Sequence, residues 1–162
     1  MSGRRRKGGY FTRRSTDPAP LVTRLRRRVG FGETDVMGVA WHGNYAAYFE
    51  QGSAELGRRC GLSYQDYFDN DLRAPIVQLH VDYLHSLRLD EEFTIVASLI
   101  WTDGARLDTE YLLLGADKRV ATSGFTVQMF IRASTGEPCI TVPDLVERCR
   151  RRWRTGQFGD LV

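Results

Sequence analysis

Residues 31–60 read FGETDVMGVAWHGNYAAYFEQGSAELGRRC, and the second half of this stretch predicts the one long helix of the chain. From Asn44 to Cys60, apolar residues recur at intervals of three and four positions, which is the spacing of a helix face that packs on a core. Gly61 then ends the helix. Alanine, serine and glycine are frequent along it, and such small side chains let a surrounding sheet approach closely. We therefore expect a helix that is buried on more than one side.

Strands are predicted on both sides of this helix. One strand precedes it at Leu21–Phe31, and others follow at 77–83, 93–101, 106–114 and 119–131, with a short helix or turn at 63–70. Short, turn-rich connections between the later strands favour an antiparallel four-strand meander. The helix has to be wrapped by this sheet to bury both apolar surfaces, which predicts an α+β fold.

Charge is concentrated at the two ends of the chain, although the net charge is only +3. Six Arg and Lys residues crowd the first 20 positions, where Asp17 is the only acid. This arm could suit nucleic acid, an acidic partner or a transit peptide. A flexible, solvated arm is the commoner outcome, and no aromatic stacking pattern supports binding to nucleic acid. At the other end, Pro143 and Asp144 open a helix whose polar side carries a second arginine run, from Arg148 to Arg154.

Length and composition indicate one domain. With 162 residues, of which 42% are hydrophobic, the chain is long enough for a single core. We place this domain at residues 21–155, between the arm at 1–20 and a short tail at 156–162. No apolar run approaches the roughly 20 residues that span a bilayer, and the N-terminal segment lacks the apolar core of a secretory signal. We therefore expect a soluble, cytoplasmic protein with no membrane partner.

Several kinds of site are not supported by the sequence. Gly30-Phe31-Gly32 starts like a dinucleotide-binding motif, but the element order that should follow it is absent. There is no G-x-S-x-G motif of a serine hydrolase, and the three histidines lack the spacing of metal ligands. Cysteines 60, 139 and 149 are odd in number without a C-x-x-C pair, so we expect reduced thiols. A hydrolase built on this chain would therefore use a carboxylate, with no metal and no cofactor.

Asp35 is the strongest candidate for that carboxylate. It lies between a strand and the long helix, in a segment that Gly30, Gly32 and Gly38 keep irregular. Asn44 can cap the helix, so that its first N–H groups point back toward the Asp35 loop. For an aspartate in such a place, a role as a cap or a turn residue is the common one, and that role stays open here.

The residues around Asp35 form the pattern D-x-x-G-x-x-x-H-x-N-Y-x-x-Y-x-E, which resembles the hotdog-fold acyl-CoA thioesterases and, among them, the 4-hydroxybenzoyl-CoA thioesterase family. The pattern consists of Asp35, Gly38, His42, Asn44, Tyr45, Tyr48 and Glu50. A weaker resemblance extends over residues 24–149. It implies an antiparallel sheet wrapped around a central helix, and homodimers or homotetramers with active sites at the subunit interface.

The same resemblance implies roles for individual residues. Asp35 would be the catalytic nucleophile or the general base that activates water, and the backbone N–H of His42 would bind the thioester carbonyl oxygen. Apart from these implied roles, the residues themselves suggest candidates for substrate binding, namely Gly38, Trp41, Asn44 and, for a coenzyme A phosphate, Arg106, which follows a turn at a strand start; Glu50 is a possible second carboxylate. Plainer roles are open to each: loop geometry for Gly38, core packing for Trp41, a cap or interface contact for Asn44, a solvated charge for Arg106, and a salt bridge or interface hydrogen bond for Glu50.

The resemblance predicts an enzyme that hydrolyses an acyl-CoA thioester to a free acid and coenzyme A. Two alternatives stay open. The chain could be a non-catalytic acyl-CoA-binding or regulatory protein of the same fold, or a thioesterase acting on acyl carrier protein, whose acidic surface would attract the basic arm or the C-terminal helix. The sequence does not distinguish an aromatic acyl group from a short or long aliphatic one.

Overall fold

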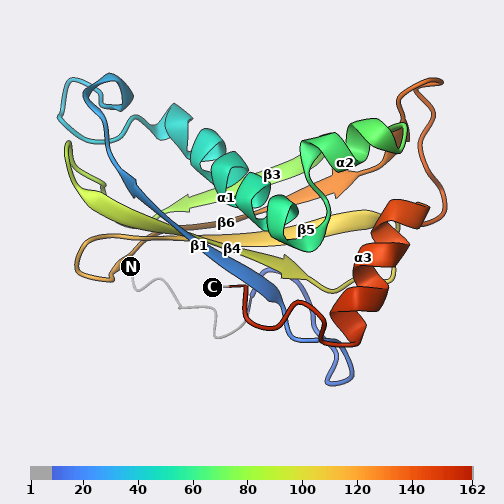
Figure 1. Cartoon of the computed structure of the whole chain (residues 1–162). Coiled ribbons are helices and arrows are strands. Elements are labelled where there is room, and N and C mark those ends of the chain that lie inside the picture. The colour runs from blue at the N-terminus through green and yellow to red at the C-terminus, as the bar shows by residue number, and fades with distance from the viewer. Residues whose placement is uncertain (1–8, 162) are drawn as a thin grey trace.

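One antiparallel sheet and one long helix make up most of the protein (Figure 1). The computed structural model describes residues 9–161. The larger elements are β1 (Leu21–Arg28), α1 (Tyr45–Cys60), β3 (Ile76–Tyr83), β4 (Glu92–Ile100), β5 (Arg106–Leu114), β6 (Val120–Met129) and α3 (Asp144–Arg154). The shorter ones are the 3₁₀ turns η1 (Phe31–Glu33) and η2 (His42–Asn44), the helix α2 (Tyr64–Asp69), and the strands β2 (Leu72–Arg73) and β7 (Ile131–Arg132). The predicted α+β fold, in which an antiparallel sheet wraps one long helix, is confirmed.

The order of strands in the large sheet is β1-β4-β5-β6-β3. The predicted meander is confirmed for β4, β5 and β6, but its extension to β3 was wrong, because β3 pairs with β6 at the far edge. The connection between β3 and β4, residues 84–91, is too long for a tight hairpin. It hydrogen-bonds instead to the loop before α1, where the Ala40 N–H donates to the Leu87 carbonyl at 2.7 Å. Leu87 is fully buried, which anchors this connection.

β3 is an edge strand with exposed apolar side chains. Its alternating sequence predicts a half-buried strand, whereas the structure leaves most of its residues exposed. Ile76, Val77 and Leu79 are 53%, 51% and 47% exposed. The alternating pattern correctly predicted a strand with apolar side chains. Within the described residues, however, no other strand pairs with the outer edge of β3.

α1 packs on the inner face of the sheet, mainly over β4 and β1 (Figure 1). Gly52 allows this contact, because a Cβ atom there would lie 2.7 Å from the Ile95 side chain. Away from these contacts, Ala46 and Ala47 are exposed. The prediction of a helix buried on more than one side was therefore wrong for the single chain, since one sheet covers only one helix face.

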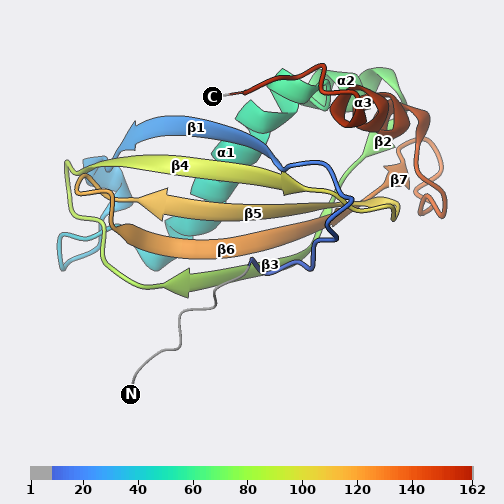
Figure 2. The ribbon, with the colours of Figure 1, turned by 90° about the horizontal axis from the view of Figure 1, so that it is seen from below.

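The described part of the N-terminal arm lies against the outer face of the sheet (Figure 2). The Tyr10 hydroxyl is 2.6 Å from Asp82 Oδ2 and 2.7 Å from Ser123 Oγ. The rings of Tyr10 and Phe11 both pack against Phe125 of β6, with centroid distances of 5.1 and 5.3 Å. These contacts are made by the two aromatic side chains of the arm and not by its basic residues. The basic cluster at positions 4–7 lies outside the described residues.

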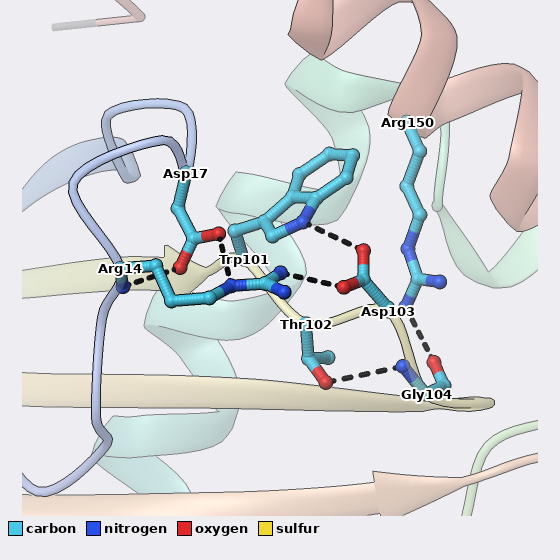
Figure 3. Close-up of polar contacts among 7 residues, drawn as sticks. All are labelled: Arg14, Asp17, Trp101, Thr102, Asp103, Gly104 and Arg150. Atoms are coloured by element: carbon cyan, nitrogen blue, oxygen red, sulfur yellow. Dashed lines mark hydrogen bonds and ion pairs between the residues drawn. The ribbon is translucent and has the colours of Figure 1, made fainter.

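The C-terminal helix α3 forms as predicted, with most of its arginines exposed. Arg150 is the exception at 7% exposure, and its Nη2 donates to the Gly104 carbonyl at 2.7 Å (Figure 3). In the same cluster, Asp103 accepts hydrogen bonds from the Trp101 indole at 3.1 Å and from Arg14 at 2.5 Å. These contacts tie the arm, the β4–β5 turn and α3 together.

All three cysteines are free thiols, as predicted. Cys60 of α1 and Cys149 of α3 are both buried. A hydrogen bond with Cys149, together with burial, raises the pKa of the Cys60 thiol. Between residues 9 and 161, no helix combines the length and the apolar character that crossing a membrane requires.

Candidate active site

Asp35 lies in a short hairpin-like loop that connects β1 to α1. Thr34 and Ala40 pair as an isolated antiparallel bridge, and the Asp35 N–H donates to the Val39 carbonyl at 2.9 Å. Gly38 has a φ of +73°, a backbone conformation that residues with a side chain rarely adopt. The role of Gly38 in loop geometry is therefore confirmed, while its contact with substrate stays a prediction.

The Asp35 carboxylate is half-buried and uses one oxygen to shape this loop. Its Oδ1 accepts a hydrogen bond from the Met37 N–H at 2.8 Å, which is the geometry of an Asx turn. In the described part of the chain, Oδ2 has no hydrogen-bond partner. Asp35 is thus a turn residue, but this role leaves one carboxylate oxygen available for a substrate or a water molecule.

The helix begins with the 3₁₀ turn His42–Asn44, which runs directly into α1. The prediction that Asn44 caps the helix was wrong, because Asn44 already has helical dihedral angles and makes no capping hydrogen bond. Its side-chain amide instead donates to the Glu33 carbonyl at 2.6 Å, and the Trp41 N–H donates to the same carbonyl at 2.8 Å. These two bonds tie the start of the helix to the far side of the Asp35 loop.

The start of the helix leaves backbone donors uncapped. Among residues 9–161, the N–H groups of His42 and Gly43 have no hydrogen-bond acceptor. Aligned peptide dipoles give such a helix start a partial positive charge of about half an elementary charge. An uncapped pair of N–H groups is what the predicted oxyanion role of the His42 backbone requires, and that role stays a prediction. The His42 imidazole is exposed and lies 5.1 Å from the Trp41 ring.

Two residues of this region were not predicted. Tyr83 of β3 donates its hydroxyl hydrogen to the His42 carbonyl at 2.8 Å, and its ring lies edge-on to Tyr45 at 4.9 Å. Gly43 leaves room for the half-exposed Trp41 ring, which a Cβ atom at that position would strike. The sequence holds no local signal for the Tyr83 contact, since its partner is 41 positions away. Gly43, between two polar residues at a helix start, could have been recognised as a turn glycine.

Two predicted site residues lie elsewhere. Glu50 is exposed in α1, which begins five residues earlier at Tyr45, and it accepts a hydrogen bond from the Tyr64 hydroxyl at 3.1 Å, away from the Asp35 loop. Arg106 starts β5 at the opposite end of the sheet from the Asp35 loop and forms an ion pair of 3.0 Å with Asp108. Burial raises the pKa of the Asp108 carboxyl, although Arg106 acts in the opposite direction. Within one chain, Arg106 does not share a site with Asp35.

The structure thus brings five of the predicted residues into one unit, consisting of the loop and the helix start. They are Asp35, Gly38, Trp41, His42 and Asn44. In the part of the chain that the structure describes, no group of three or more His, Cys, Asp or Glu side chains is placed to hold a metal ion. Chemically, the unit offers a free carboxylate oxygen on the same loop as backbone donors suited to a developing negative charge.

Residues 29–149 match the family described as the Thioesterase-like superfamily. The chain belongs to this superfamily. A "Putative esterase" of Aquifex aeolicus is 31% identical over 96 residues, which are 59% of this chain and 75% of that protein. A "Putative acyl-CoA thioesterase YneP" of Bacillus subtilis is 30% identical over 70 residues, which are 43% of this chain and 51% of that protein.

Solved structures agree with this assignment. The crystal structure of the DHNA-CoA thioesterase of Staphylococcus aureus matches with a TM-score of 0.71 and 25% identity, over 84% of this chain and 88% of that chain. This thioesterase-like chain has the hotdog fold, as the resemblance implied. The family match includes the Asp35 loop, all of α1 and the first half of α3. Family and fold together support hydrolysis of a thioester.

Proposed function

We propose that this thioesterase-like protein hydrolyses an acyl-CoA thioester to a free acid and coenzyme A. The observation that carries the proposal is the helix start. There, the N–H groups of His42 and Gly43 have no acceptor among the described residues, and the adjoining loop supplies an unpartnered oxygen of Asp35. The names of two similar proteins, an acyl-CoA thioesterase and a DHNA-CoA thioesterase, favour coenzyme A as the thiol.

In this proposal, the thioester carbonyl oxygen accepts hydrogen bonds from the uncapped N–H groups. These donors stabilise the negative charge that develops on the oxygen when the carbonyl carbon is attacked, and one such donor is worth about 3 kcal/mol in comparable sites. The positive end of the α1 dipole acts in the same direction.

Asp35 acts in one of two ways. In the first, its free oxygen attacks the carbonyl carbon, the carbon–sulfur bond breaks, and water then hydrolyses the resulting anhydride. In the second, it takes a proton from a water molecule that attacks in its place. In both routes coenzyme A leaves as a thiolate that becomes protonated, and the carboxylate is regenerated. The proposal needs no metal and no cofactor beyond the coenzyme A of the substrate, and a cytoplasmic location suits it.

We also propose that the active unit is a homo-oligomer joined along β3. Four apolar or aromatic residues of this edge strand, Ile76, Val77, Leu79 and Tyr83, are about half exposed. An unpaired apolar edge invites pairing with another strand, and a second copy of the chain offers the matching edge. A dimer is the simplest such assembly, and a tetramer would pair two of them.

The test is Asp35→Asn, with Asp117→Asn as the matched control. Each aspartate accepts a hydrogen bond from the N–H two positions later, at 2.8 Å from Met37 and at 3.0 Å from Arg119. Asparagine keeps this acceptor and removes the charge. We expect Asp35→Asn to lower kcat for thiol release from acyl-CoA by about 100-fold or more, and Asp117→Asn to leave it unchanged. Equal activity of the two variants would refute the role of Asp35.

Two alternatives can be separated from this proposal with the same protein. A non-catalytic acyl-CoA-binding protein would bind acyl-CoA without releasing thiol. A thioesterase of acyl carrier protein is favoured by the exposed arginines of α3, which would attract an acidic carrier. These are Arg148, Arg151, Arg152 and Arg154. If Arg151→Glu slows hydrolysis of acyl carrier protein substrates and spares acyl-CoA, the carrier is the substrate.

A further inference from the structure

A cavity of about 270 Å³ lies beside α1, between the helix and the inner face of β5 and β6. It exists because α1 crosses the sheet at an angle to the strands (Figure 2) and packs mainly over β4 and β1. Its volume is close to the lower end of ordinary ligand sites, about 300 Å³. None of the five residues of the loop and helix start lines it, whereas Glu50 of α1 does.

The cavity extends along most of α1 and begins at the end where the candidate active site lies. Ala46 lines it in the first turn of the helix, and Cys60 lines it in the last. At the rise of an α-helix, these two residues are about 21 Å apart. An acyl group whose carbonyl is bound at His42 would pass Ala46 and continue along the helix. This shape favours an elongated acyl group over a single compact ring.

Hydroxyl groups gather in the middle of this largely apolar cavity. The Tyr111 hydroxyl lies 3.0 Å from Thr126 Oγ1, and both residues are buried. Ser53 of α1 and Thr109 of β5 line the cavity as well. The Phe49 ring stacks on Tyr111 with centroids 4.4 Å apart and planes within 5°, which fixes the position of the phenol.

This cluster has unused hydrogen-bonding capacity. The Tyr111 hydroxyl interacts with the hydroxyls of Thr126, Ser53 and Thr109. Because each hydroxyl group has one donor and two acceptor positions, these contacts leave positions free on the serine and threonine groups. Gln128 also lines the cavity; its Nε2 donates to the Ala74 carbonyl at 2.7 Å, while its Oε1 has no partner in the described chain. Polar groups in such a place cost stability unless they are hydrogen-bonded, so they suit a ligand that brings an oxygen of its own.

We propose, resting on the thioester hydrolysis proposed above, that this cavity holds the acyl group and that Tyr111 and Thr126 select an elongated chain carrying a hydroxyl or keto oxygen. Ser53, at the level of the cluster, follows His42 by 11 residues, which corresponds to about 16 Å along the helix. The selected oxygen therefore lies far from the thioester, near the end of a chain of medium length.

The experiment compares lauroyl-CoA with ω-hydroxylauroyl-CoA. The test variants are Thr126→Val and Tyr111→Phe, which remove single hydroxyls, and the control is Thr122→Val, a buried threonine of the same strand outside the cavity. Affinity is measured by titration calorimetry in an Asp35→Asn background, and turnover by thiol release from the enzyme with Asp35 intact. We expect a roughly tenfold preference for the hydroxylated chain, which corresponds to about 1.4 kcal/mol, as one neutral hydrogen bond would give.

The proposal is supported if Thr126→Val and Tyr111→Phe lose this preference while Thr122→Val retains it. The proposal is overturned if the protein with an unsubstituted cavity binds both acyl-CoAs equally well. It is also overturned if Thr126→Val and Thr122→Val prefer the hydroxylated chain to the same extent. The calorimetric readout does not depend on catalysis. If the enzyme with Asp35 intact hydrolyses no thioester while the binding preference still depends on Thr126, the proposed hydrolysis fails and the cavity assignment stands.

Discussion

Removing the Tyr83 hydroxyl should weaken catalysis without unfolding the protein. In the Tyr83→Phe variant, the His42 carbonyl loses the 2.8 Å hydrogen bond that ties the helix start to β3. The ring remains, and with it the edge-on contact with Tyr45 at 4.9 Å. The variant therefore removes one bond that positions the N–H groups of His42 and Gly43, and leaves those groups in place.

The size of the effect depends on exposure. Tyr83 is 54% exposed, so water can replace the lost partner of the His42 carbonyl. We expect the free energy of unfolding to fall by about 0.5 kcal/mol, at the low end for a hydrogen bond. The loss in catalysis should be larger, because oxyanion donors are effective only when their positions are fixed. Removing a donor costs about 3 kcal/mol, so loosening two of them should cost about 1 kcal/mol, or roughly fivefold in kcat.

The assay is steady-state thiol release from acyl-CoA, with thermal unfolding measured on the same samples. Tyr10→Phe is the control, because the Tyr10 hydroxyl bonds to Asp82 at 2.6 Å on the outer face of the sheet. We expect kcat to fall in Tyr83→Phe with KM nearly unchanged, and neither to change in Tyr10→Phe. Equal kcat values in the two variants, or a change in KM with kcat unchanged, would show that Tyr83 does not position the two N–H donors.

Three further outcomes are expected. Gly52→Ala should lower the free energy of unfolding by about 1–3 kcal/mol, because its Cβ would lie 2.7 Å from the Ile95 side chain; an unchanged melting temperature would contradict the close helix–sheet contact. Leu79→Lys, at a position 47% exposed on β3, should leave a monomer by light scattering, and an unchanged molar mass would rule out pairing through this edge. Burial raises the pKa of Tyr48 to about 12 in the folded protein, whereas an unfolded tyrosine has a pKa of about 10. The raised pKa therefore contributes stability that is fully present below about pH 10 and is lost as the pH rises toward 12. In urea unfolding across this pH range, the free energy of unfolding should fall more steeply for the unsubstituted protein than for Tyr48→Phe. Equal slopes in the two proteins would show that Tyr48 is not the cause of the pH dependence.

What the sequence predicted well is what neighbouring residues determine. The long helix follows from an apolar period within residues 44–60, and the turns that separate β4, β5 and β6 carry their own glycine and aspartate signals. The position of β3 depends on its pairing with β6, about 45 residues later, and no local pattern encodes that choice. Asn44 was assigned as a cap from its residue type alone, whereas the preceding 3₁₀ turn had already started the helix.

The same limit applies to the candidate site. Asp35, Gly38, Trp41, His42 and Asn44 are close in sequence, so a short motif could place them together. Tyr83 is brought to His42 only by the fold, and the cavity hydroxyls come from three elements. Arg106 was a candidate because it follows a turn at a strand start, and the structure places that strand start at the other end of the sheet.

Three features of the molecule lie on the same side and are open to solvent, because α1 leaves part of the sheet uncovered there. The exposed face of α1, the unpaired edge of β3 and the cavity all adjoin the part of the sheet that α1 leaves uncovered. Ile76 belongs to two of them, since it lines the cavity and is 53% exposed on the edge strand. A second copy paired along β3 would extend the sheet and cover this side, so oligomer formation and acyl binding would be linked. By mass action, an acyl-CoA that fills the cavity should then lower the dissociation constant of the oligomer. The Leu79→Lys monomer should in turn bind acyl-CoA more weakly, although position 79 does not line the cavity.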